Sequence, residues 1–344
     1  MDTLLLQNTN DDINTAVKIL QNGGIVAIPT ETVYGLAANA LNGKAVAKIF
    51  KAKNRPMDNP LIVHISEFSD IQKYNLAKEV PETARLLAEH FWPGPLTIIV
   101  KRTEVIPNEV SAGLDTVAIR MPSHRLANEL IKKADTPLAA PSANLSGSPS
   151  PTLANHVLKD LRGKIDAVID GGESEVGVES TVITLVTDVP RVLRPGGITV
   201  EQLKEVLGEV EIDEAVISGL ENNAVASSPG MKYKHYAPKA NVVLLKGSDD
   251  EYINYVNKNA SNNVVALCCD EDVNLLNVKT YSLGRRNDYV TQAHRLFDEL
   301  RKIDDDDFAG IVYSRLPSID GVGLALYNRL IRAAAFEVID LEKM

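Results

Sequence analysis

A short apolar run that ends in hydroxyl and carboxyl side chains constrains the fold more than any other feature. Residues 25–28 are apolar and can form one buried strand, and they are followed by Thr30, Glu31, Thr32 and Tyr34. Open α/β sheets bind their ligands at the carboxyl ends of such strands. The sequence therefore predicts an α/β fold with a binding site directly after this strand.

A basic segment follows, although the chain as a whole has a net charge of −10. Its members, with no acidic residue between them, are Lys44, Lys48, Lys51, Lys53 and Arg55. A solvated helix face explains Lys44 and Lys48 equally well. Pro56 is expected to end the helix and to leave Lys51, Lys53 and Arg55 on a loop that leads to Asn59. Cations beside an amide side chain favour a binding site for phosphate or carboxylate.

Further predicted strands of the first half also end in polar or cationic residues. Arg120 ends one apolar run, Arg194 ends another, and Ser180 lies at the entry of a third. The loop at residues 141–151 contains four serines, one asparagine and three prolines. Phosphate or ribose binding would use its many donors, although an ordinary surface loop is the alternative. These strand ends are expected to converge on one concave site.

The composition changes after residue 208, which divides the chain into three parts. Residues 209–240 are first acidic and then resemble a linker, but residues 231–238 contain two tyrosines, a histidine and two lysines. We expect this segment to close over the site, and docking on its own domain is the alternative. From residue 241 strands alternate with helices, which predicts a smaller Rossmann-like parallel α/β domain over residues 241–344.

Charge, cysteine content and hydropathy exclude several classes of protein. The acidic net charge argues against stable nonspecific binding to nucleic acid. Cys268 and Cys269 are neighbours in an apolar run and would point to opposite faces of a strand, so we expect buried thiols without a disulfide. The first twelve residues do not resemble a secretion signal, and no apolar stretch is long enough to span a membrane. The sequence thus favours a cytoplasmic protein that does not contact membranes.

Seven segments, in this order and spacing, resemble the motifs of the YrdC-like family of threonylcarbamoyl-adenylate synthases. They are PTETVYGL, KNRP with DNPLIVHI, FWPGPLT, VAIRMP, APSANLSGSPSPT, VESTVI and RPGG. The resemblance covers about residues 10–208, and SSPGMKYKHYAP together with the second α/β domain resembles the longer, two-domain members. It implies that residues 1–208 form the catalytic domain, an open, twisted α/β sheet around a concave cationic site.

The resemblance also implies a nucleotidyltransferase reaction. L-Threonine, bicarbonate and ATP would give threonylcarbamoyl-adenylate and pyrophosphate, with Mg²⁺ bound to the ATP phosphates. Downstream proteins would then transfer the threonylcarbamoyl group to the adenosine next to the anticodon in certain tRNAs.

Matching motif positions implies the residues of the site. The threonine pocket would consist of Thr32, His64, Arg120, Ala140 and Ser180. ATP would be held by Arg55, Asn59, Thr116, Ser142, Ser150 and Arg194, with Tyr236 of the linker closing the site. Lys53 and Arg55 are the predicted catalytic residues, Lys51 would add positive charge, and no side chain is predicted to bind a metal directly.

The residue types agree with this chemistry. Every reactant is anionic, so fixed cations and amide donors lower the barrier by positioning and by preorganised electrostatics. A carbamate oxygen is already anionic at neutral pH, so the attack on the α-phosphate needs no strong general base. Glu31 and Glu179 are the acids within the motifs, and structural hydrogen bonds are favoured over orienting a metal-bound water or the threonine amine.

Two other functions remain open from the sequence alone. A cationic cavity also suits an RNA-binding or nucleotide-sensing regulatory module, but the acidic net charge and the closing segment favour the enzyme. A carbamoyl-transferring domain for another substrate would share the chemistry. Specificity for threonine rests on the resemblance.

Overall fold

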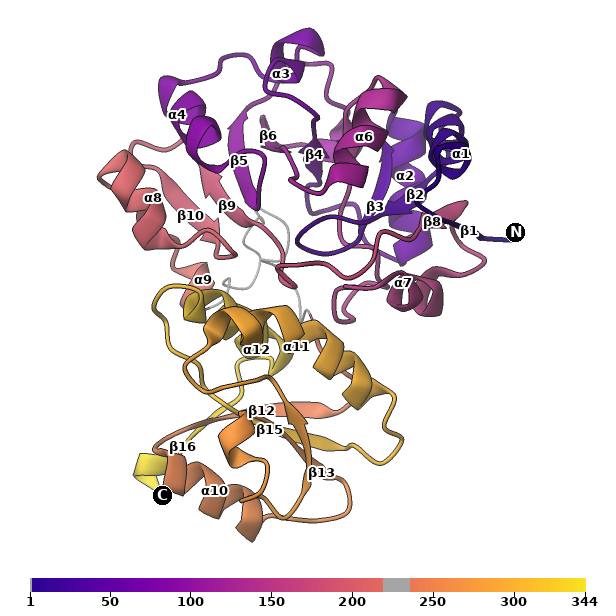
Figure 1. Cartoon of the computed structure of the whole chain (residues 1–344). Coiled ribbons are helices and arrows are strands. Elements are labelled where there is room, and N and C mark those ends of the chain that lie inside the picture. Colours follow the sequence, from indigo (N-terminus) through magenta and orange to yellow (C-terminus); the bar gives the residue numbers. More distant parts are fainter. Residues whose placement is uncertain (1, 219–235) are drawn as a thin grey trace. The chain divides into compact units, whose positions relative to one another are not determined.

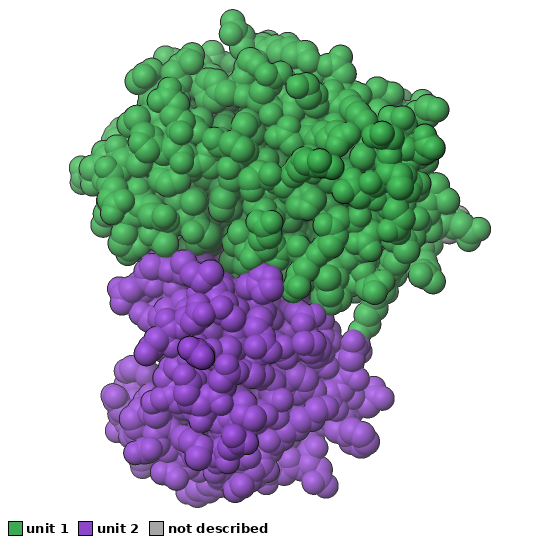
Figure 2. All heavy atoms as spheres, in the orientation of Figure 1, with its two compact units in different colours: residues 1–146, 150–232 green, residues 147–149, 233–344 purple. Residues whose placement is uncertain are grey.

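The computed structural model describes residues 2–218 and 236–344, and the chain divides into two compact units (Figure 1). The first unit consists of Met1–Ser146 and Ser150–Lys232, and the second of Gly147–Pro149 and Tyr233–Met344 (Figure 2). The domain limits at residues 208 and 241 stay predictions. Most of the predicted linker, residues 219–235, lies outside the described residues.

The first unit is built on a mixed sheet of eleven strands in the order β1-β8-β2-β3-β7-β4-β6-β5-β9-β10-β11. Its strands are β1 (Leu4–Leu6), β2 (Val26–Ile28), β3 (Gly35–Asn39), β4 (Ile62–His64), β5 (Leu96–Lys101), β6 (Thr116–Arg120), β7 (Leu138–Ala139), β8 (Ala167–Ile169), β9 (Thr181–Thr184), β10 (Arg191–Arg194) and β11 (Glu211–Ile212). The short central strands are almost completely buried. The predicted α/β class is therefore confirmed for this half of the chain.

Helices surround this sheet (Figure 1). They are α1 (Asn10–Gln21), α2 (Gly43–Lys53), α3 (Asp70–Lys73), α4 (Glu82–Phe91), α5 (Asn108–Ser111), α6 (Arg125–Ala134), α7 (Ala154–Leu161), α8 (Val200–Leu207) and α9 (Ala215–Ser218). The apolar faces of α1 and α6 pack together in one core with residues of β2, β3, β7 and β8. This packing holds β2 in place, and the segment with Glu31 and Thr32 follows that strand.

The end of α2 corrects one sequence prediction. Lys51 and Lys53 lie in the last turn of the helix and not on a loop. Asn54 caps this helix in a left-handed conformation with a φ of 51°, and Asn is one of the few residues that adopts this conformation readily. The helix therefore ends at its cap, and of the three cations only Arg55 lies beyond it.

The second unit is a parallel sheet of five strands in the order β14-β13-β15-β12-β16. The strands are β12 (Asn241–Lys246), β13 (Val264–Cys268), β14 (Lys279–Ser282), β15 (Ile311–Arg315) and β16 (Val338–Asp340). The helices are α10 (Asp249–Lys258), α11 (Tyr289–Asp304) and α12 (Gly323–Ala333), with short 3₁₀ turns at Asp270–Asp272 and Leu341–Lys343. The smaller parallel α/β domain predicted from the sequence is confirmed. Both cysteines are buried and free.

No helix within residues 2–218 and 236–344 is long and apolar enough to cross a membrane.

Tyr34 joins the segment after β2 to the loop after β8. Its ring is completely buried. Its hydroxyl donates to the carbonyl of Gly172 at 2.7 Å and accepts from the N–H of Gly171 at 3.2 Å. Burial raises the pKa of this phenol, so the hydroxyl stays protonated. The aromatic residue of the first motif therefore stabilises the backbone around the site.

We expect Tyr34→Phe to lower the free energy of unfolding of the first unit by about 1–2 kcal/mol, because both backbone groups lose a buried partner. Trp92 is the only tryptophan of the chain and lies in this unit, so urea unfolding followed by its fluorescence measures the effect. Tyr74→Phe is the control, because the Tyr74 hydroxyl donates to the exposed carboxylate of Asp135. Equal stability of the two variants would contradict the role of Tyr34.

Candidate active site

The centre of the candidate site lies where three neighbouring strands place polar side chains side by side. β4 and β6 are parallel with His64 opposite Arg120, and β5 is antiparallel to β6 with Thr97 opposite Arg120. All three side chains are buried. Two residues of the predicted threonine pocket, His64 and Arg120, are therefore brought together by strand pairing.

Arg120 is held by partners from the segment after β2. Its guanidinium forms an ion pair with Glu31 at 2.7 Å and donates to the Thr32 hydroxyl at 2.8 Å and to the Gly94 carbonyl at 3.3 Å. Burial alone would raise the pKa of Glu31, but the charge and hydrogen bond of Arg120 bring it below its usual value. The pair is thus ionised and fixed, as a buried charge requires.

His64 is neutral beside this pair. Burial, and then the positive charge of Arg120, lower the pKa of His64 to about 3. Its Nδ1 lies 3.2 Å from the carbonyl oxygen of Ile62. At physiological pH the imidazole therefore offers hydrogen bonds and no charge to a ligand.

Ser180 connects the predicted threonine residues with the predicted ATP residues. Its hydroxyl lies 2.7 Å from that of Thr97 and accepts a hydrogen bond from Arg194 at 3.2 Å. Arg194 also donates to the Ser180 carbonyl at 3.1 Å. The cation at the end of β10 is thereby linked through Ser180 to Thr97 of β5, the strand that pairs with β6 and its Arg120.

Lys53 anchors the serine-rich loop. Its ammonium, on a side chain that is 2% exposed, donates to the carbonyls of Ser142 at 2.5 Å and Asn144 at 2.6 Å. Ser150, at the far end of this loop, donates to Glu179 at 2.5 Å. Both ends of the loop are thus attached to the body of the first unit. Glu31 pairs with Arg120 and Glu179 accepts from Ser150, so both acids of the motifs have a protein partner.

Asn59 has a buried amide side chain whose polar atoms lack a partner among the described residues. It is 1% exposed, and neither its amide nitrogen nor its amide oxygen has a hydrogen-bond partner within the described part of the chain. Arg55 donates to the Asn59 carbonyl at 3.2 Å. Buried unsatisfied polar groups are rare and need an explanation, for which a ligand is one.

The remaining predicted residues lie further from Arg120 or have no side-chain contact with it. Thr116 is at the amino end of β6, four residues and about 13 Å along the strand from Arg120. Ala140 follows β7, and its N–H donates to the Ile62 carbonyl. Tyr236 packs its ring 5.2 Å from that of Phe297 in the second unit.

Thr97 was missed as a site residue. Its hydroxyl is completely buried and contacts Ser180. The available signal was its position, because it is the polar residue that interrupts the apolar run at 96–100. A lone threonine in a strand is too common to be assigned to a site by sequence alone.

We expect the free energy of unfolding of the first unit to fall less between pH 7 and pH 5 in His64→Asn than in the parent chain. An unfolded histidine binds a proton near its ordinary pKa, whereas folded His64 does not, so stability is present above pH 6.5 and is lost as the pH falls toward 3. Between pH 7 and 5 this group contributes about 2 kcal/mol of the loss. Urea unfolding at both pH values measures it.

The control is His90→Asn at the exposed end of α4, which should keep the pH dependence of the parent chain. An unchanged pH dependence in His64→Asn would show that His64 is protonated in the folded state.

Two family models together match most of the chain. The model described as telomere recombination matches residues 18–196, and the model described as threonylcarbamoyl-AMP synthase, C-terminal domain, matches residues 198–335. The two models meet between residues 196 and 198.

Curated relatives and solved structures agree with the models. The threonylcarbamoyl-AMP synthase of Pyrococcus abyssi is 44% identical over 333 residues, 95% of each chain, and that of Bacillus subtilis is 45% identical over 337 residues, 96% of each chain. The structure of P. abyssi Sua5 complexed with L-threonine aligns with a TM-score of 0.91 and 41% identity over 99% of both chains. The family inferred from the seven motifs is confirmed: this chain belongs to the two-domain threonylcarbamoyl-AMP synthases.

Proposed function

We infer that this chain is a threonylcarbamoyl-AMP synthase that makes its product and pyrophosphate from L-threonine, bicarbonate and ATP. The observation that carries the proposal is the buried cluster of Arg120, Glu31, Thr32 and His64 in a chain of this family. The complex of the P. abyssi relative with L-threonine supports the amino-acid substrate. The tRNA role follows from the same family.

The charges of the cluster suit an amino acid. Arg120 offers a planar donor that pairs well with a carboxylate. Glu31 offers the opposite charge, and neutral His64 adds no net charge. A zwitterion such as L-threonine would therefore find a partner for both of its charged groups, and the Thr32 hydroxyl would lie next to its carboxylate.

ATP is proposed to bind on the side of Asn59, Arg55 and Arg194. The unpartnered Asn59 amide has both donors and an acceptor for a nucleotide, and the two arginines supply positive charge. Ser142 and Ser150 belong to the loop that Lys53 and Glu179 hold in place. With this arrangement Lys53 acts by positioning the loop.

The reaction needs positioning more than proton transfer. The threonine amine and bicarbonate condense to a carbamate with loss of water, and a carbamate oxygen then attacks the α-phosphate while pyrophosphate leaves. The bond to the carbamate oxygen forms as the bond to pyrophosphate breaks, so negative charge moves onto the leaving group. Cations fixed in a buried site stabilise this charge without reorganisation.

We propose that Mg²⁺ enters the site bound to the ATP phosphates. Within residues 2–218 and 236–344 no group of three or more His, Cys, Asp or Glu side chains is placed to hold a metal ion. Glu31 and Glu179 are already engaged with protein partners. The ion would therefore be bound chiefly by phosphate oxygens and water, and its chemistry would be charge neutralisation on ATP.

The product is proposed to pass to the proteins that attach the threonylcarbamoyl group to tRNA. A mixed anhydride between a carbamate and AMP is prone to hydrolysis, so a consuming enzyme must follow closely. The alternative of an RNA-binding regulatory module is less well supported, because the relatives that match the full length are synthases.

Pyrophosphate release from ATP tests the reaction directly. We expect release to require both L-threonine and bicarbonate, because the attacking carbamate contains both. The full chain is assayed with each substrate omitted in turn, and the adenylate is identified by mass spectrometry. Release that is independent of threonine would leave only nucleotide hydrolysis.

We expect Thr32→Val to raise the KM for L-threonine about tenfold and to leave the affinity for ATP within about twofold. The substitution keeps the shape but removes the hydroxyl that orients Arg120, and a hydrogen bond to a charged group is worth about 1.5 kcal/mol. Steady-state kinetics and calorimetry give the two values. The matched control is Thr136→Val, whose buried hydroxyl donates to Asn39. Equal losses for both substrates would contradict the threonine assignment.

A further inference from the structure

The second unit contains a cavity of about 70 Å³ that the proposed reaction does not use. It lies at the carboxyl ends of the neighbouring strands β13 and β15. Five leucines contribute to its apolar lining: Leu267, Leu283, Leu316, Leu326 and Leu330. Its polar lining includes Arg286, Arg315 and Tyr289. At about 30 Å³ for each water, the cavity has room for about two waters, which is enough for the head group of a small anion.

The position of the cavity is the one at which open parallel sheets bind ligands. From β13 the chain turns to β14 at one edge of the sheet, whereas from β15 it continues through α12 to β16 at the other edge. Neighbouring strands whose connections diverge leave a crevice outside their carboxyl ends. The cavity lies in this crevice, and all of its lining residues belong to the second unit.

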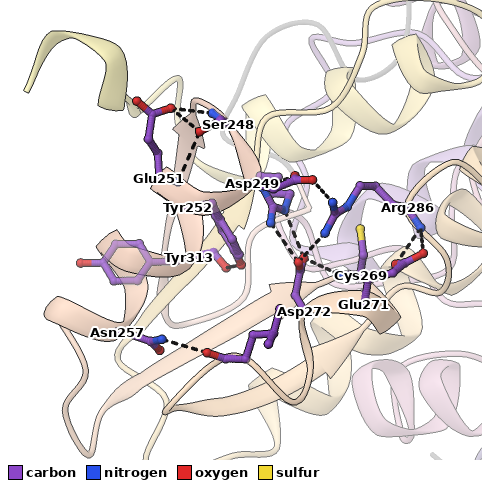
Figure 3. A network of polar contacts seen from close by, with 12 residues as sticks. Ser248, Asp249, Glu251, Tyr252, Asn257, Cys269, Glu271, Asp272, Arg286 and Tyr313 are labelled. Carbon is purple, nitrogen blue, oxygen red and sulfur yellow. Dashed lines mark hydrogen bonds and ion pairs between the residues drawn. The ribbon is translucent and has the colours of Figure 1, made fainter.

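A buried aspartate fixes the two guanidinium groups of the cavity (Figure 3). Asp272 has a completely buried side chain and pairs with Arg286 at 2.6 Å and with Arg315 at 2.9 Å. The guanidinium of Arg315 also lies 4.0 Å from the centre of the Tyr252 ring. Both cations are therefore held in place before any ligand arrives.

A second aspartate occupies the outer side of the same guanidinium groups. Asp249, at the start of α10, pairs with Arg286 and, at 2.9 Å, with Arg315, and its side chain is 50% exposed (Figure 3). Exposed ion pairs contribute little stability. Asp249 is therefore the one carboxylate of the four-residue network that an incoming anion can replace at small cost.

Arg286 retains capacity for a further partner. Its Nε is buried and makes no hydrogen bond within the described part of the chain. Burial, and then the neighbouring charge of Arg315, lower the pKa of Arg286. Two guanidinium groups that repel each other gain from each additional negative charge between them.

We propose that this cavity binds a small organic anion whose carboxylate or phosphate group pairs with Arg286 and Arg315 in competition with Asp249. The apolar part of the ligand would lie against the five leucines. Guanidinium forks pair bidentately with either head group. The second unit would then be a ligand-binding domain in its own right, and this inference holds whether or not the proposed function of the first unit is correct.

The test is a calorimetric titration of the full chain with inorganic phosphate and, separately, with butanoate. We expect Arg286→Gln to weaken binding about tenfold or more, because a charge-assisted hydrogen bond is lost. Asp249→Asn should tighten binding, because it removes the competing carboxylate. The matched control is Arg285→Gln, an exposed neighbour with the same change of charge that does not line the cavity.

Arg194→Gln distinguishes anion binding in the first unit from binding in this cavity. It removes a cation of the first unit and should leave the cavity of the second unit unchanged. The head group that binds more tightly identifies the ligand class. A gain of affinity in Asp249→Asn cannot come from misfolding, so it supports the site even if Arg286→Gln is unstable. Failure of both probes to bind the parent chain and Asp249→Asn would overturn the proposal, as would equal binding to Arg286→Gln and the parent chain.

Discussion

The buried ion pair between Arg120 and Glu31 is the interaction on which the candidate site depends. An isolated charge would be too costly in this interior, so each member needs the other and further hydrogen bonds. Thr32 and the Gly94 carbonyl supply them to Arg120. His64 beside the pair stays neutral chiefly because it is buried, and the positive charge of Arg120 adds to this effect. The pair thus fixes the position of Arg120 and contributes to the charge state of its neighbour.

Both units share one arrangement: oxygen atoms of the protein hold cationic side chains in place at a candidate site. Lys53 is held by the carbonyls of the serine-rich loop, and Arg194 by Ser180. In the second unit Asp272 holds Arg286 and Arg315. Preorganised charges of this kind stabilise anions without paying for rearrangement at the moment of binding. An acidic chain can in this way contain local sites for anionic ligands.

Much of the fold was predictable where the residue pattern was strong. The strand at residues 25–28 and the parallel domain after residue 241 followed from an apolar run and from the alternation of strands with helices. β3 was not predicted, because four of its five residues are Gly, Ala or Asn, which have weak strand propensity, and the segment forms a strand between β2 and β7. The end of α2 was misplaced because Pro56 was taken as the stop, whereas Asn54 provides the cap.

The sequence by itself determined the α/β class, the family and the set of polar residues at strand ends, because these depend on local pattern and motif order. Only the tertiary structure decided which of them meet. Strand register placed Thr97 and His64 beside Arg120, and chain topology opened the cavity between β13 and β15. These contacts depend on the pairing of strands that are distant in the sequence. The residue types along the chain do not by themselves specify that pairing.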